Sequence, residues 1–227
     1  MIRVAIAGAG RMGQAIAASL DAQDGMELAG LWGRGDDLNS LVRCADVVID
    51  FSLPEGTLQV LDAVEKYGKP LVCGVSGLSD EQMARLDQVA ARVPVVYDRN
   101  MSLGVAVLEH SVREAAKSLG LDFEIEIAEV HHVHKKDAPS GTALKLGEAI
   151  AEARGEQGTG SVEFRSERRG EVPGDHDVAM RSPTESLTFA HSVTTRQVFA
   201  DGAIRAARWV ADRPAGRYLM RDVLFEI

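Results

Sequence analysis

The fold of this chain is decided by its opening stretch, Ile2-Arg-Val-Ala-Ile-Ala-Gly8-Ala9-Gly10-Arg11-Met12-Gly13. A strand-like apolar run is followed by the spacing G-x-G-x-x-G and then by a helical pattern through Leu20, which is the order that a dinucleotide-binding turn requires. Gly8 permits the tight turn, Gly10 lets the backbone approach a pyrophosphate, and Gly13 lets the helix pack closely on the strand. The glycine spacing alone would indicate only a βα turn, but its context favours the dinucleotide interpretation.

Strands and helices keep alternating over the first hundred residues. Strands are predicted at 26–32, 47–51, 71–73 and 93–97, and helices at 54–67 and 79–91. This pattern predicts an α/β fold with a doubly wound, Rossmann-type sheet, whose ligands bind beyond the carboxyl ends of the strands. The loops 51–54 and 74–77 fall at those ends. Glycines in the second loop fit either turn chemistry alone or contact with a nicotinamide.

The end of the second strand bears on the choice of cofactor. A carboxylate near this point usually binds the ribose hydroxyls of NAD, whereas an arginine accommodates the extra phosphate of NADP. Gly33 leaves room here and Arg34 supplies the cation. Asp36 and Asp37 are expected to lie too far along the loop. The sequence therefore favours NADPH, with NADH as the alternative.

The second half of the chain has a different pattern. Helices are predicted at 102–119 and 141–153, strands at 122–130, 161–168, 177–181 and 186–193, and a last helix at 197–211. The first of these strands alternates apolar and acidic residues, as a strand with one wet face does. We expect an α+β domain with an open, mixed sheet over 102–204, and a dinucleotide-binding domain made of 1–101 and 205–227.

Bulk properties exclude several classes of protein. The 227 residues carry 25 basic and 34 acidic side chains, a net charge of −9, so no global field attracts nucleic acid or anionic lipid. Cys44 and Cys73 are the only cysteines, which is typical of reduced thiols in a cytoplasmic protein. The chain opens on a strand rather than a signal peptide. No apolar run approaches the ~20 residues of a membrane helix.

The chemistry is concentrated in one segment, Glu129-Val-His131-His132-Val-His134-Lys135-Lys136-Asp137-Ala-Pro139-Ser140-Gly141-Thr142. Imidazole can give or take a proton near neutral pH, and an ammonium group holds an anion. Ser140 is a good helix N-cap, so Gly141 and Thr142 offer backbone N–H groups to a carboxylate. The segment therefore supplies an acid, a cation and an anion cradle, as a catalytic site for an acidic small molecule requires.

The histidines also have other interpretations. Adjacent strand residues point to opposite faces, so His131 and His132 can border one cleft only if the strand ends near them. His132 and His134 resemble paired zinc ligands, but a third ligand is missing and the neighbouring lysines would repel a cation, so we expect no metal. Structural histidines on a solvated strand, and plain capping by Ser140, remain alternatives.

These residues resemble the dihydrodipicolinate (4-hydroxy-tetrahydrodipicolinate) reductase family nearly from end to end. The resemblance is carried by the segments 8–13, 50–56, 100–104, 129–142, 169–176 and 220–224. The segment 129–142 is highly specific, whereas the glycine turn alone would not be. The chain departs from the family at Gly33, Val75 and Met101, where acidic, hydroxyl and aromatic side chains respectively are common.

The resemblance implies reduction of a cyclic, dicarboxylated imine-type substrate by NAD(P)H in diaminopimelate and lysine biosynthesis. It implies that His131 is the proton donor and Lys135 its catalytic partner, and that His132, Gly141 and Thr142 hold the substrate's carboxylates. Arg34 would meet the 2′-phosphate. The other cofactor contacts would come from Gly8, Ala9, Gly10, Arg11, Met12, Gly74, Val75, Ser76, Asp98, Arg99, Asn100 and Met101. The family is typically a homotetramer built through the sheet of the second domain, which would thus serve both substrate binding and oligomerisation.

Two competing functions are considered. An aspartate- or homoserine-type NAD(P)-dependent dehydrogenase would explain the first domain but not the segment 135–142. A non-catalytic, NADPH-binding regulator would bind the cofactor without consuming it, and the complete set of acid, cation and anion cradle argues against it.

Overall fold

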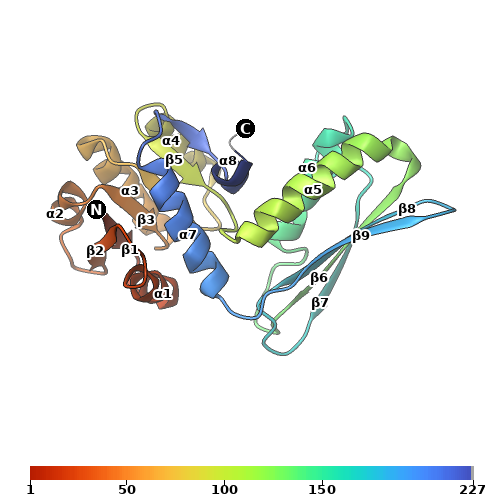
Figure 1. The fold of residues 1–227 in the computed structure, drawn as a ribbon, viewed down its shortest axis with the longest axis horizontal. Coiled ribbons are helices and arrows are strands. Elements are labelled where there is room, and N and C mark those ends of the chain that lie inside the picture. The colour runs from red at the N-terminus through yellow and green to blue at the C-terminus, as the bar shows by residue number, and fades with distance from the viewer. Residues whose placement is uncertain (226–227) are drawn as a thin grey trace. The chain divides into compact units, whose positions relative to one another are not determined.

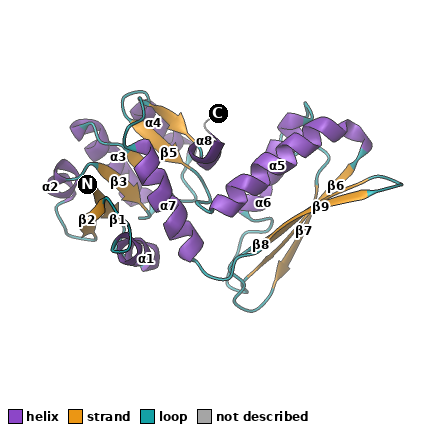
Figure 2. Cartoon of the chain, in the orientation of Figure 1, coloured by secondary structure: helices purple, strands orange, loops and turns teal. Residues whose placement is uncertain are grey.

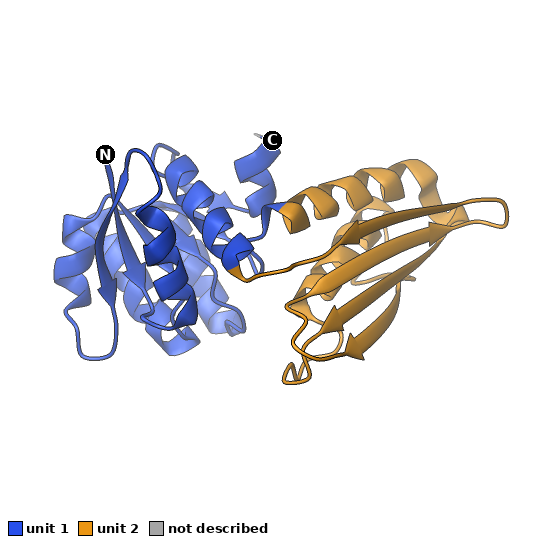
Figure 3. Cartoon of the chain, turned by 60° about the horizontal axis from the view of Figure 1, so that its bottom comes forward, with its two compact units in different colours: residues 1–103, 197–227 blue, residues 104–196 orange. Residues whose placement is uncertain are grey.

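The computed structural model describes residues 1–225 and divides into two compact units (Figure 3). Residues 104–196 form unit 2, and the rest of the chain forms unit 1. The first boundary lies within two residues of the expected one. The second lies at Gln197 rather than at 205, because helix α7 (Gln197–Val210) is continuous and packs against strands β3, β4 and β5 of unit 1. Because the buried face of α7 packs on the sheet of unit 1, the whole helix belongs to the core of that unit.

Unit 1 is a doubly wound α/β sheet, as predicted (Figure 1). Its other elements are β1 (Ile2–Ala7), α1 (Arg11–Leu20), β2 (Met26–Trp32), α2 (Leu38–Cys44), β3 (Val47–Asp50), α3 (Pro54–Tyr67), β4 (Leu71–Cys73), α4 (Asp80–Ala90), β5 (Pro94–Tyr97), β10 (Gly216–Tyr218) and α8 (Met220–Phe225). All strands are parallel, in the order β10-β5-β4-β3-β1-β2. Helices α1 and α7 lie on one face of the sheet and α2, α3 and α4 on the other (Figure 2).

Three elements of unit 1 were not predicted: α2, β10 and α8. Each is short, and β10 has only three residues. Helix α2 is capped by Asp37, whose side chain accepts a hydrogen bond from Ser40 N at 3.2 Å. Helix α8 is anchored through Asp98, whose Oδ2 accepts from Met220 N at 3.2 Å. The formation of β10 and α8 depends on contacts with residues that are distant in sequence. No local sequence pattern therefore predicts these two elements.

The glycine turn has the geometry that its spacing predicts. Gly8 has φ +104°, and a Cβ there would lie 2.5 Å from the carbonyl oxygen of Phe51. A Cβ at Gly13 would collide with the carbonyl oxygen of Gly8, so helix α1 lies directly against the turn. Only glycine is compatible with both positions.

The carboxyl ends of the strands form one edge of the unit 1 sheet. Ala7, Asp50, Cys73 and Tyr97 are register partners across β1, β3, β4 and β5. The loops that follow these four strands therefore leave the sheet at the same level. This edge is where a doubly wound sheet places its ligands.

Unit 2 has a four-stranded mixed sheet, as predicted. Its elements are α5 (Leu103–Leu119, which begins at the unit boundary), a 3₁₀ turn (Gly120–Asp122), β6 (Glu124–His131), α6 (Gly141–Ala153), β7 (Glu163–Arg168), β8 (Asp175–Arg181) and β9 (Ser186–His191). The order is β7-β6-β8-β9, with β6 and β7 parallel and the other pairs antiparallel. Helices α5 and α6 cover one face (Figures 1 and 2).

The alternation along β6 decides which residues face the helices. Ile125, Ile127, Glu129 and His131 are buried, and the residues between them are more exposed. His131 therefore lies on the helix-covered face, at the last position of the strand. No helix within residues 1–225 combines the length and the apolar composition needed to cross a bilayer.

Candidate active site

A cavity of about 880 Å³ opens in unit 1 at the carboxyl ends of β1, β2 and β3. Its lining comprises Gly8, Ala9, Gly10, Trp32, Gly33, Arg34, Gly35, Asp36, Phe51, Ser52, Leu53, Glu55, Gly56 and Gln59. Four of the expected cofactor residues, Gly8, Ala9, Gly10 and Arg34, are in this lining. Arg11 and Met12 follow as the first residues of α1 but are not part of the lining.

The cavity fits a dinucleotide in two respects. A Cβ at Gly10 would meet no atom within 4 Å, so the turn leaves open space where a phosphate can approach the backbone and the start of α1. The guanidinium-bearing side chain of Arg34 lies on the cavity wall formed by the loop after β2. The glycine turn would hold the pyrophosphate and Arg34 would hold an anionic group on the ribose.

The structure corrects the expectation for Asp36, which was placed too far along the loop. Asp36 lines the same cavity as Arg34 because its Oδ2 accepts a hydrogen bond from Gly33 N at 2.8 Å, which folds the loop back. Asp37 instead caps helix α2 and is not part of the lining. The cavity wall therefore carries both a cation and a carboxylate.

The remaining expected cofactor residues lie in the loops after β4 and β5. Gly74 packs under the ring of Phe51, where a Cβ would collide, and Val75 is buried while Ser76 is exposed. Asp98 and Met101 are buried, and Arg99 is exposed beside half-buried Asn100. The structure places these residues at the ligand-binding edge of the sheet but outside the cavity lining. Asp98 also has the structural duty of anchoring α8.

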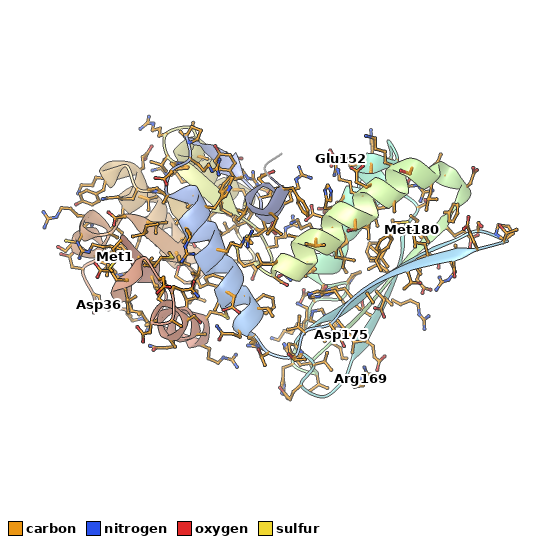
Figure 4. The ribbon with its side chains drawn as sticks, in the orientation of Figure 1. Met1, Asp36, Glu152, Arg169, Asp175 and Met180 are labelled. Carbon is orange, nitrogen blue, oxygen red and sulfur yellow. The ribbon has the colours of Figure 1, made fainter. Side chains whose placement is uncertain are left out.

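In unit 2, His131 is held by a carboxylate on its own strand. Nδ1 of His131 contacts Oε2 of Glu129, two residues earlier on the same strand face. The other carboxylate oxygen of Glu129 accepts from Nη1 of Arg168 at 3.0 Å. Strand β7 brings Arg168 there because it is the register partner of His131. Arg169 and Asp175 mark this end of the sheet in Figure 4.

Lys135 lies in the loop that follows β6. Its Nζ forms an ion pair with Oδ2 of Asp137 at 2.8 Å. Burial alone would raise the pKa of Asp137, but the hydrogen bond and charge of Lys135, with a backbone hydrogen bond from Gly141, lower it below the ordinary value. The ammonium group and the first amide of α6 thus already hold a carboxylate, which is an intramolecular one.

Another histidine, His176, links His131 to the start of α6. Ser140 caps this helix by accepting from Ala143 N at 3.1 Å, and its Oγ lies 3.3 Å from Nε2 of His176. The rings of His176 and His131 meet edge to face, with centroids 5.1 Å apart. The structure therefore brings His131, Lys135 and the start of α6, with Gly141 and the buried Thr142, into one region.

His132 and His134 belong to the same loop as Lys135, whose backbone N donates to the carbonyl oxygen of His132 at 3.1 Å. His132 follows the end of β6 and is half-buried, while the 74% exposed His134 pairs with Glu171 at 3.4 Å. Their ring centroids are 6.1 Å apart. Within residues 1–225, no three His, Cys, Asp or Glu side chains are grouped in a way that could hold a metal ion.

Burial governs the proton affinities of the buried histidines. It lowers the pKa of His131, although the hydrogen bond and charge of Glu129 oppose this effect. Burial lowers the pKa of His176 to about 3, helped by the neighbouring His131. Glu129 behaves differently: burial alone would raise its pKa, but hydrogen bonds from Ser166, Arg168 and His131 bring it below the ordinary value. Glu129 is therefore ionised and His176 neutral at pH 7.

Sequence reasoning missed Glu129, Arg168 and His176 as parts of this site. Glu129 could have been found, because strand alternation places it on the same face as His131. Arg168 and His176 could not, because they depend on β7 and β8 pairing with β6 in one particular register.

Comparison with known proteins agrees over both units. The family model described as "Dihydrodipicolinate reductase, N-terminus" matches residues 2–101, and "Dihydrodipicolinate reductase, C-terminus" matches residues 104–224. The 4-hydroxy-tetrahydrodipicolinate reductase of Zymomonas mobilis is 42% identical, over 96% of this chain and 95% of the relative. That of Caulobacter vibrioides is also 42% identical, over 98% of this chain and 97% of the relative.

Solved structures share the fold. The dipicolinate-bound dihydrodipicolinate reductase of Paenisporosarcina sp. TG-14 has a TM-score of 0.82 at 24% identity, covering 96% of this chain and 97% of that one. The aspartate dehydrogenase of Thermotoga maritima has a TM-score of 0.53 at 11% identity, covering 92% of this chain and 96% of that one. The likeness to a dehydrogenase of the competing type is therefore one of fold alone.

Proposed function

The chain belongs to the dihydrodipicolinate reductase family, and from that premise we propose how its residues carry out the reaction of the family. The chain reduces 4-hydroxy-tetrahydrodipicolinate with NAD(P)H in lysine biosynthesis. In balance, the substrate, NAD(P)H and a proton yield tetrahydrodipicolinate, NAD(P)⁺ and water. The bound cofactor supplies a hydride. The chain's residues must bind two carboxylates and deliver the proton.

His131 donates the proton in this proposal. A hydride that reaches one carbon of a conjugated imine leaves an electron pair on the conjugated partner, and a positioned acid donates a proton to that pair. The observation that supports this role is the contact between Glu129 and Nδ1 of the His131 imidazole at the end of β6. Lys135 and the start of α6 lie in the same region. Protonated His131 then has its Nε2–H for the substrate.

Lys135, Gly141 and Thr142 bind substrate carboxylate in this proposal. Support comes from Asp137, whose carboxylate meets both the ammonium group of Lys135 and the backbone amide of Gly141. A substrate carboxylate offers the same chemistry to the same donors. His132, on the opposite side of the strand end from His131, is proposed for a second carboxylate contact. Cations placed here also stabilise the negative charge that develops in the transition state.

NADPH is the proposed preferred cofactor, with NADH accepted as well. Arg34 would pair with the 2′-phosphate of NADPH, and Asp36 on the same wall would accept a hydrogen bond from the 2′-hydroxyl of NADH. One oxygen of Asp36 already accepts from Gly33 N, which weakens its attraction for a hydroxyl. The other proposed cofactor contacts, at 74–76 and 98–101, follow from their place at the carboxyl ends of β4 and β5.

A homotetramer is the proposed assembly, formed through the face of the unit 2 sheet that α5 and α6 leave uncovered. This face carries the small side chains of Ala128, Ala179 and Ala190 together with charged ones, such as Asp177, which is the register partner of both Ala128 and Ala190. Two such faces could pack against each other, as sheets do in face-to-face packing, with charged side chains of both signs available for pairing across the contact.

The test of this mechanism is the oxidation of NADPH, followed at 340 nm, with substrate made in situ from pyruvate and aspartate semialdehyde. His131→Gln and Lys135→Ala should each lower kcat by about 10²–10³, the usual cost of one transition-state stabiliser. NADPH affinity, measured by fluorescence titration, should change little. Near-normal turnover in both variants would overturn the assignment, whereas NADPH binding without turnover in the unmodified chain would indicate a regulator.

A further inference from the structure

Glu129 is buried and forms a charged pair with part-buried Arg168, and the proposed mechanism uses only the contact of Glu129 with His131. Glu129 is 2% exposed, and its two oxygens bind His131 Nδ1 and Arg168 Nη1. Arg168 makes further contacts with the loop after β6, because its Nε donates to Lys135 O at 3.3 Å and its Nη2 donates to Asp137 O. One arginine therefore connects the carboxylate behind His131 to the backbone that carries Lys135.

Burying such a pair is costly, which argues for a specific role. A buried ion pair often contributes nothing to stability when compared with apolar residues of the same size. Glu129 and Arg168 contact each other, and the pair also has hydrogen bonds with Ser166 and the carbonyl oxygen of Glu167. Its other hydrogen bonds named above end on the segment 131–137. The pair thus ties strands β6 and β7 to the residues proposed to act on the substrate.

We propose that Glu129 and Arg168 are positioning residues that fix the tautomer of His131 and the placement of Lys135. The inference rests on the proposed role of His131. An ionised carboxylate can only accept, so Nδ1 of His131 carries a hydrogen directed at Glu129. The nitrogen left for the substrate is Nε2, and a side chain at position 174 would crowd it, since a Cβ at Gly174 would lie 2.9 Å from Nε2.

This arrangement lets the proton leave without any rotation of the ring. When protonated His131 acts, the Nε2–H bond breaks and its electron pair stays on the imidazole. The proton bonds to the substrate carbon that holds the pair left by hydride addition. The product is neutral imidazole with hydrogen on Nδ1, still bound to Glu129. The carboxylate also stabilises the positive charge that the ring bears beforehand, as in other acid–base pairs.

The charged and titratable groups facing His131 come from four places. Glu129 on β6 is the single anion among them, Arg168 on β7 and Lys135 in the loop are cations, and His176 on β8 is neutral at pH 7. Neutralising Glu129 would leave two cations and a buried site, all of which oppose protonation of the ring. Glu129→Gln keeps the shape of the side chain and removes this charge.

Nitrogen-15 NMR of the histidine rings tests the inference without reference to activity. In the unmodified protein, the neutral form of His131 should carry its hydrogen on Nδ1. In Glu129→Gln, the pKa measured for His131 should fall by about 1–3, the usual effect of a close opposite charge. Hydrogen on Nε2 in the unmodified protein would overturn the inference, as would an unchanged titration in Glu129→Gln. If Glu129→Gln does not fold, the tautomer in the unmodified protein decides alone.

Kinetics separate this inference from the proposed function. Above the pKa the protonated fraction falls tenfold for each pH unit, so kcat at pH 7.5 should fall at least about tenfold in Glu129→Gln. Arg168→Lys should keep more activity than Arg168→Gln, because it retains a cation. Glu81→Gln and Arg92→Gln, at exposed positions of unit 1 outside the proposed site and interface, are matched controls. A shifted NMR titration with an unshifted pH–rate profile would support the positioning role and remove His131 as the proton donor.

Discussion

Arg34 and Asp36 show how a single loop can present opposite charges to one cavity. Both side chains line the cavity at the end of β2, although they are separated by Gly35. The hydrogen bond from Gly33 N to Asp36 closes the loop and brings the carboxylate back to the wall. In the proposed function, Arg34 attracts the 2′-phosphate of NADPH and the carboxylate of Asp36 repels it.

Substitution of these two residues should shift cofactor preference in opposite directions. Arg34→Ala should raise KM for NADPH about tenfold or more and leave KM for NADH nearly unchanged, since only NADPH carries the extra phosphate. Asp36→Asn should lower KM for NADPH by removing repulsion. Steady-state kinetics with each cofactor measure both effects. Equal effects of Arg34→Ala on the two cofactors would refute the assignment.

His176 makes stability depend on pH in a defined window. Its pKa is about 3 in the folded protein and near 6.5 when unfolded, so the unfolded state binds more protons below pH 6.5. The free energy of unfolding should therefore fall as pH falls from 6.5 towards 5, by up to about 1.4 kcal/mol per pH unit from His176 alone. The lowered pKa values of His131 and His191 act in the same direction.

Urea unfolding at several pH values checks this expectation. His176→Gln should make the dependence on pH less steep between pH 6.5 and 5. His134→Gln is the matched control, because His134 is 74% exposed and should leave the slope unchanged. An identical slope in His176→Gln and the unmodified protein would contradict the buried, neutral state of this ring.

At the scale of elements, the glycines in the turn between β1 and α1 have different roles, one in folding and one in ligand binding. Gly13 is required because α1 lies against the carbonyl of Gly8, which leaves no room for a methyl group. Gly10 has an ordinary φ of −77° and open space around it, so no contact within the protein demands a glycine there. The same short motif thus contains one glycine needed for packing and one that leaves room for a ligand.

Alanine at these two positions should have contrasting effects. Gly13→Ala should lower the free energy of unfolding by about 1–3 kcal/mol, the usual cost of overpacking. Gly10→Ala should change it by less than about 1 kcal/mol but weaken NADPH binding, because the methyl group occupies the approach of the pyrophosphate. Urea unfolding and fluorescence titration measure the two quantities. Equal stability of the two variants would show that the helix does not press on the turn.

At the scale of the whole molecule, the uncovered sheet of unit 2 is the feature that points to assembly. Sedimentation velocity should give a mass four times the 24.4 kDa of one chain. Ala190→Arg, which places a charge on this face, should yield smaller species with the fold intact by circular dichroism. Ala91→Arg, the same change at an exposed alanine of unit 1, should leave the tetramer unchanged. A monomer in the unmodified protein would remove this proposal.

Much of the fold and of the site could be predicted from local patterns. The apolar run and glycines at 2–13, the alternation along β6 and the capping residues before α6 each act over a few neighbouring residues. Such patterns also placed the histidines and lysines of 131–136 beside the helix start at Gly141 and Thr142, and the family resemblance then selected His131 and Lys135 among them. Backbone geometry and side-chain periodicity are local properties, so the sequence alone determined them.

Tertiary structure decided the rest. Arg168 meets Glu129 only because β6 and β7 pair in parallel at one register, and His176 reaches His131 only because β8 pairs on the other side. The loop that returns Asp36 to the cavity and the continuity of α7 into unit 1 likewise depend on contacts that no short window contains. Register and packing bring together residues that are distant in sequence. The partners that affect the pKa of His131, the proposed acid, can therefore be identified only in the folded chain.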